Sequence, residues 1–223
     1  MNGEIHDEKD YAELNRLGTK LGIPIPMLML GVEVKNPDGT IVQHYNGRSH
    51  TWVRNFWNYL IGVVGGVTGT GATFGAGSLG ISVGNNYCPS IDFRQSNQIP
   101  YLKGEGDTKG IFVGTGTGAE SFETQDITTK IASGSSTGQL SYSSHTGPIT
   151  VYDAATKKWT VTTIRQFTNS SGASISVKET GLLYYRDTGY SYLFCRDLLS
   201  SAVSVPAGSV LTVTYLHTLT FPA

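Results

Sequence analysis

The sequence predicts a mainly β protein: an antiparallel β-sandwich, jelly-roll-like, with one short aromatic helix and an N-terminal arm. The clearest indication is near the C-terminus, where apolar side chains recur at every second position; they are Leu211, Val213, Tyr215, Leu219 and Phe221, with His217 as the one polar member. A spacing of two places all six side chains on one face of a strand. Glycine supplies 28 of the 223 residues, and this glycine content, together with abundant Ser and Thr, is typical of all-β proteins with many turns.

Composition narrows the classes of function. Charged residues make up 15% of the chain and the formal net charge is −1, so there is no basic excess for binding nucleic acid. No apolar run reaches the roughly 18 residues of a membrane-spanning helix, and the N-terminus lacks the basic and apolar regions of a signal peptide. We therefore expect a protein that is made in the cytoplasm and is not attached to a membrane. The two cysteines, Cys88 and Cys195, are expected to be buried thiols rather than a disulfide.

The N-terminal arm comprises residues 1–25, and residues 26–223 form the sandwich domain. Apolar residues within the arm follow a helical spacing and are ended by Gly22 and Pro24; they are Tyr11, Leu14, Leu17 and Leu21. A helix this short is marginal alone. It either docks on its own domain or reaches a neighbouring subunit, and both alternatives stay open.

A hairpin is predicted over residues 27–46, because alternating apolar residues flank the turn sequence of residues 36–39. Next comes an aromatic helix over about residues 50–63, whose apolar face includes Trp52 and Phe56 and whose start is capped by Ser49 or Thr51. This helix either packs on the sheet as core or anchors another subunit in a groove. The residues expected to make assembly contacts are therefore Tyr11, Leu14, Leu17, Leu21, Trp52 and Phe56.

Residues 65–84 are rich in glycine but contain no lysine, so they do not match a phosphate-binding P-loop, and a loop is expected there. Residues 85–109 are irregular. A short strand begins at residue 110, and residues 139–143 and 149–152 are predicted to form a hairpin. The strands over residues 159–167 and 175–185 are predicted to pair through a turn that ends at Gly172.

No catalytic, cofactor-binding or metal-binding set of residues is found. The five histidines are scattered without ligand spacing, and no serine lies in a nucleophile elbow. Glu179 shares the parity of apolar neighbours, so it is expected to be buried in an ion pair. Arg165 is its candidate partner if the loop between the two strands has three residues and ends at Gly172, which is the alternative we prefer. A two-residue loop would place Arg165 on the opposite face of the sheet from Glu179. His217 is expected to be a hydrogen-bonded interior or interface histidine.

Three groups of residues resemble a set of tailed-bacteriophage virion proteins. They are residues 49–60; residues 113–118 with 127–132 and 138–140; and residues 165–169, 177–182, 196–198 and 205–215. The resemblance implies a non-enzymatic β-sandwich component of the phage particle, such as a head decoration, collar or tail protein. It implies a location in the virion, and other virion proteins and copies of the same chain as partners.

A second hypothesis is a carbohydrate-binding receptor-recognition module. Its aromatic platform would consist of four tyrosines, namely Tyr184, Tyr185, Tyr190 and Tyr192. The alternative is that some of these side chains belong to the core, since tyrosine favours β-strands in any case.

Overall fold

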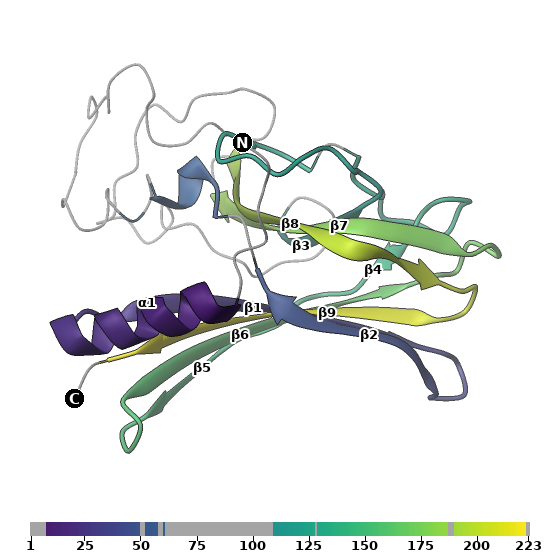
Figure 1. The fold of residues 1–223 in the computed structure, drawn as a ribbon. Coiled ribbons are helices and arrows are strands. Elements are labelled where there is room, and N and C mark those ends of the chain that lie inside the picture. Colours follow the sequence, from purple (N-terminus) through teal and green to yellow (C-terminus); the bar gives the residue numbers. More distant parts are fainter. Residues whose placement is uncertain are drawn as a thin grey trace.

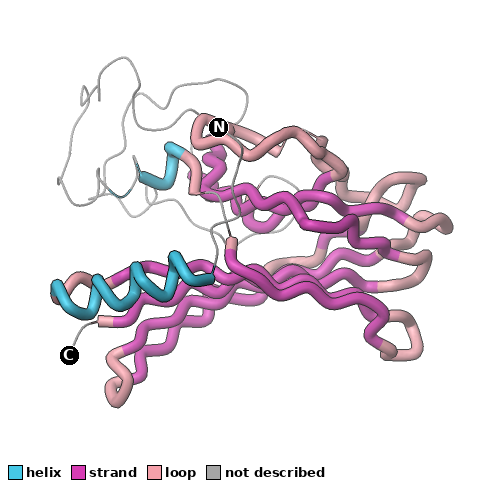
Figure 2. Tube along the Cα trace, viewed as in Figure 1, coloured by secondary structure: helices cyan, strands magenta, loops and turns pink. Residues whose placement is uncertain are grey.

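The computed structural model describes residues 8–49, 52–57, 60, 109–127, 129–186 and 190–221. Over these residues two antiparallel β-sheets pack face to face, and a 14-residue helix, α1 (Glu8–Leu21), lies beside the larger sheet (Figures 1 and 2). The predicted fold class, a mainly β antiparallel sandwich, is confirmed. The glycine-rich segment 65–84 and residues 85–108 lie outside the described residues, as does Cys88.

The larger sheet, sheet A, contains six strands. In spatial order they are β2 (Ile41–Arg48), β1 (Ile25–Lys35), β9 (Val210–Thr220) and β6 (Lys158–Thr168), followed by β4 (Ser141–Tyr142) and β5 (Thr146–Asp153), which both pair with β6. The predicted hairpin is β1–β2, with Gly39 at a φ of 88° in its turn. Strand β1 also pairs with β9 along its whole length. Strands from opposite ends of the sequence therefore lie side by side in sheet A.

The hairpin predicted between residues 139–143 and 149–152 is wrong. Both segments pair with β6, through Tyr142↔Phe167 and Tyr152↔Trp159, and they form two parts of one interrupted edge. The true hairpin is β5–β6. Turn residues such as those at 145–148 mark either a reversal or an interruption of a strand, and the sequence does not distinguish the two.

The smaller sheet, sheet B, has three strands: β3 (Gly110–Gly114), β7 (Ile175–Arg186) and β8 (Tyr190–Val205), with β7 in the middle. Both of its edges are covered. The edge of β3 is met by the segment 129–131, where the Ile131 amide donates to the Val113 carbonyl at 3.0 Å. The edge of β8 is met by Val53, whose amide donates to the Phe194 carbonyl at 3.0 Å.

The pairing predicted between residues 159–167 and 175–185 is also wrong, because β6 belongs to sheet A and β7 to sheet B. The turn itself is where the sequence indicates, since Gly172 has a φ of 76°. The buried side chain of Asn169 donates to the carbonyls of Ala173 and Val205, each at 2.7 Å. These bonds direct the chain across from one sheet to the other instead of back alongside itself. Alternation fixes which side chains face the core, but strands of both sheets face the same core.

The core lies between the two sheets and is built from alternate residues of their strands. Its members include Leu28, Leu30, Val32 and Val34 of β1, Leu211, Val213 and Tyr215 of β9, Ile175 and Val177 of β7, and Val203 and Val205 of β8. Full burial of each such aliphatic side chain stabilises the fold by about 1.5–3 kcal/mol. A second apolar cluster uses the opposite face of sheet B, and its members are Val53, Phe112, Ile127, Leu183 and Leu193.

The aromatic helix predicted over about residues 50–63 is wrong at its start. Trp52 forms a β-bridge with Cys195, and the described helical residues are 54–57 and 60. Ser49 does not cap this helix. Its hydroxyl donates instead to Asp197 Oδ2 at 2.8 Å. The edge of β8 provides hydrogen-bond partners that keep residues 52–53 extended, and this tertiary contact overrides the local helical pattern.

Candidate assembly surface

Helix α1 docks on the face of β1 that points away from the core. Gly18 makes the close approach: a Cβ at this position would lie 2.5 Å from Ile25 Cγ1. The Arg48 guanidinium lies over the Tyr11 ring, with its central carbon 4.2 Å from the ring centroid. The helix ends where predicted, with Gly22 at a φ of 67° and the Ile23 amide donating to the Gly18 carbonyl at 2.8 Å, a glycine-based C-terminal cap.

The leucine stripe, which we define as Leu14, Leu17 and Leu21, is left uncovered by this docking. The three side chains are 44%, 38% and 65% exposed. They share one flank of the helix because residues three and four apart are neighbours on a helical surface. Of the two alternatives left open by the sequence, the structure shows docking on the protein's own domain, through Tyr11 and Gly18, and it leaves the leucine face exposed.

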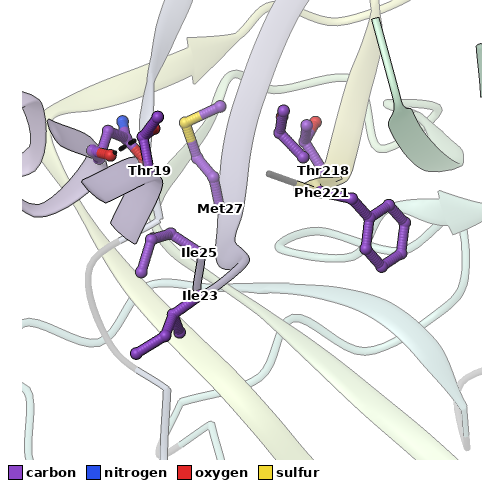
Figure 3. Close-up of a pocket in the computed structure, with 8 residues that line it drawn as sticks. Thr19, Ile23, Ile25, Met27, Thr218 and Phe221 are labelled. Atoms are coloured by element: carbon purple, nitrogen blue, oxygen red, sulfur yellow. Dashed lines mark hydrogen bonds between the residues drawn. The ribbon is translucent and has the colours of Figure 1, made fainter. Parts of the chain in front are cut away.

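A groove lies between α1 and the C-terminal end of β9 (Figure 3). Its volume is about 200 Å³, and its walls come from Asn15, Thr19, Ile23, Ile25, Met27, Thr218, Thr220 and Phe221. Two apolar side chains at its rim, Ile23 and Phe221, are 53% and 40% exposed. The wall that α1 gives to this groove is Asn15 and Thr19, so the groove lies on the other flank of the helix from the leucine stripe and is a separate feature.

Trp52 and Phe56 lie elsewhere. Both are half-buried, their ring centroids are 3.8 Å apart, and Phe56 also contacts Phe194 edge-on. Trp52 contacts His217, which lies on the opposite face of sheet A from α1. With Trp159 and Leu219 they border a small apolar pocket of about 170 Å³. The six predicted assembly residues therefore divide into two separate places, and only the leucine stripe stands clear of its own domain.

Glu179 is buried in an ion pair as predicted, but its partner is Arg196. Arg196 Nε lies 2.7 Å from Glu179 Oε2, and both side chains are almost inaccessible. The expected partner, Arg165, is buried in another part of the core, where it donates to the carbonyls of Ser143, Lys109 and Ile111. Arg165 lies on β6, in the opposite sheet from Glu179, so the mistaken strand pairing explains the mistaken partner.

The interior also holds a polar cluster that the sequence reading missed. Asp197 Oδ2 accepts hydrogen bonds from the hydroxyls of Ser49 and Tyr215, at 2.8 and 3.0 Å. Burial raises the pKa of the neighbouring Cys195 thiol well above its usual value, so this thiol is not a ready nucleophile. The available signal was the pair Arg196–Asp197 within the otherwise apolar run 192–199.

His217 was expected to be hydrogen-bonded, but among the described residues its Nε2 atom has no hydrogen-bond partner. Burial lowers the pKa of His217 to about 4, so its imidazole is neutral at pH 7.

Of the four tyrosines expected in a sugar-binding platform, Tyr192 is buried and Tyr184 stacks on Phe194 with 4.0 Å between ring centroids. The side chains of the other two, Tyr185 and Tyr190, lie outside the described part of the structure. The two described rings therefore do not provide an exposed platform.

Within the described part of the chain there is no cluster of three metal-ligating residues and no helix long and apolar enough to span a membrane. No known protein family matches the chain, and no curated protein or solved structure shows significant similarity to it. The fold and the surface define an antiparallel β-sandwich with a docked helix whose apolar face is open.

Proposed function

We propose that this protein is a non-enzymatic structural component of a tailed-bacteriophage particle, which assembles through contacts with copies of itself or with other virion proteins. The observation that carries the assembly role is the exposed leucine stripe on a helix that is already folded and docked. Exposed apolar surface of this kind on an ordered element marks protein–protein contacts. The virion location is supported by the sequence resemblance, which covers roughly residues 49–64 and 110–221.

The interior of the sandwich favours packing over catalysis. The charged side chains at the centre of the sandwich are hydrogen-bonded within the protein: Glu179 pairs with Arg196, and Asp197 accepts from Ser49 and Tyr215. Each of these groups is inaccessible to a substrate. Their arrangement suits a rigid building block, because a fully bonded buried network fixes one packing of the core.

A charge substitution in the leucine stripe tests the assembly role. Leu21→Glu places a carboxylate where an apolar contact is expected, so it should abolish incorporation of the protein into phage particles, as measured by immunoblot of purified particles. Ala12→Glu is the matched control, because it adds the same charge at another exposed position of α1 and should leave incorporation unchanged.

Circular dichroism of both variants should match the wild-type spectrum, which separates assembly from folding. Wild-type protein absent from purified particles, or equal incorporation of the two variants, would overturn the proposal. If incorporation is found, electron microscopy of antibody-labelled particles would place the protein in the head, collar or tail.

A further inference from the structure

The lateral edges of the sandwich are closed at four places within the described residues. Beyond the two covered edges of sheet B, the β2 edge is joined to β8 by Gln43, whose side chain donates to the Ala202 carbonyl at 3.3 Å and accepts from the Ser204 amide at 2.9 Å. On the opposite side, His145 Nε2 accepts from the Ile111 amide at 2.9 Å and joins the β4–β5 connection to β3. Each closure satisfies or shields backbone groups that would otherwise recruit another strand.

Strand β5 is different. It pairs with β6 on one side, and no described strand or loop pairs with its other side (Figure 1). Its side chains are exposed on both faces of the sheet: Ile149 is 48%, Val151 is 54% and Tyr152 is 49% exposed. The segment contains one charged residue, Asp153, at its very end. The irregular start of β5 at residues 146–148 interrupts the edge, but the stretch from Ile149 to Tyr152 has no protecting charge and is a template for another β-strand.

We propose that β5 pairs antiparallel with β5 of a second copy of this chain, so that sheet A continues across two molecules. This deepens the proposed function by naming how copies join. The unpaired amides and carbonyls of an edge are satisfied by a strand, not by a helix or a small molecule. A second β5 is a suitable strand because a two-fold axis makes one edge complementary to itself.

The side chains of β5 fit such a pairing. With the axis at Thr150, Ile149 of each copy lies opposite Val151 of the other, which gives two apolar cross-strand pairs on one face. Tyr152 lies opposite Pro148 on the other face. The two Asp153 carboxylates fall at opposite ends of the paired strands, so like charges are kept apart. Pro148 lies near the end of the paired segment, so its missing N–H removes at most one of the new cross-strand hydrogen bonds from each copy.

Charge substitution at two edges tests this pairing. Val151→Lys introduces a charge into the β5 edge and should weaken self-association of the purified full-length chain by roughly tenfold or more, as measured by sedimentation velocity over a range of concentrations. Val42→Lys is the matched control on β2, because Val42 is 47% exposed at the other side of the same sheet, and it should associate like the wild type.

Cysteine cross-linking tests the register. Residues that face each other across a two-fold axis are close enough for a disulfide, so Thr150→Cys should give a covalent dimer on mild oxidation. His44→Cys, at an exposed position of β2, should not, and neither should the wild-type chain.

A wild-type chain that stays monomeric at high concentration would overturn the pairing, as would equal weakening by the two lysine substitutions. Either result leaves the leucine stripe as an assembly surface, because incorporation into particles is measured separately. Conversely, a dimer that forms through β5 but is absent from particles would overturn the proposed function and not the pairing.

Discussion

Glu179 and Arg196 form a buried ion pair on neighbouring strands, and this pair holds a glycine loop against sheet B. Glu179 Oε1 accepts from the Gly116 amide at 3.0 Å, and the Arg196 guanidinium donates to the carbonyls of Gly118 and Ala119 at 3.0 and 3.2 Å. Residue 116 must be a glycine, because a Cβ there would overlap the Glu179 carboxylate. The ion pair thus connects two strands and a loop that covers them.

Removal of one member of this pair should be costly. Glu179→Gln leaves the Arg196 charge buried without its carboxylate, so we expect a loss of about 3–5 kcal/mol in the free energy of unfolding, measured by urea titration. The double variant Glu179→Met with Arg196→Met should lose less free energy of unfolding than Glu179→Met or Arg196→Met alone, because no unpaired charge remains buried. Glu13→Gln, which breaks the exposed Glu13–Arg16 pair on α1, is the control and should leave the midpoint unchanged. Equal midpoints for Glu179→Gln and Glu13→Gln would show that the buried pair has no structural role.

His217 should make the stability depend on pH. Its pKa is about 4 in the folded protein because of burial, against about 6.5 in an unfolded chain. The unfolded state therefore binds a proton first as the pH falls, and the free energy of unfolding should decrease by about 3 kcal/mol between pH 6.5 and pH 4. His217→Gln should flatten this part of the profile, measured by urea titration at several pH values, whereas His44→Gln at an exposed position of β2 should keep the wild-type slope. A profile unchanged by His217→Gln would contradict this account.

At the scale of elements, helix α1 shows both the reach and the limit of sequence patterns. The presence of the helix follows from the spacing of Tyr11, Leu14, Leu17 and Leu21, and its end follows from Gly22, whereas its start at Glu8 was not predicted. The sequence does not show which face of the helix docks. In sequence terms Gly18 is only a residue of low helix propensity, and its role in docking is visible only in the structure, where it packs against Ile25. The leucine face, which hydrophobicity alone would place against the domain, is the face left open.

Gly18→Ala separates a docked helix from a free arm. In a free arm, alanine would strengthen the helix by about 1 kcal/mol and slow amide exchange. In the docked helix the added methyl group meets Ile25, so α1 should lift and its amides should exchange faster, measured by hydrogen–deuterium exchange. Leu14→Ala, on the exposed stripe, is the control and should leave exchange in α1 unchanged. Slower exchange in Gly18→Ala would mean that the helix does not dock in solution.

At the scale of the whole molecule, the class of fold and the inward-facing residues follow from alternation, but the pairing of strands does not. Residues 159–167 and 175–185 are adjacent in sequence and have matching parity, yet they belong to different sheets because Asn169 turns the chain across the core. The partner of Glu179 was missed for the same reason. The exposed edge of β5 could not be predicted from the sequence either, since only the complete sheet shows which strand lies at its edge.

The pairing of β1 with β9 has a consequence for folding during synthesis. Ile25 meets Thr220 and Lys35 meets Val210, so sheet A stays divided until the final strand has left the ribosome. Until then the β1–β2 hairpin on the nascent chain exposes its inward-facing leucines and valines, and contacts so distant in sequence form slowly. This domain therefore cannot complete sheet A before residues 210–220 have been synthesised, and chaperones have the whole of that interval in which to bind it.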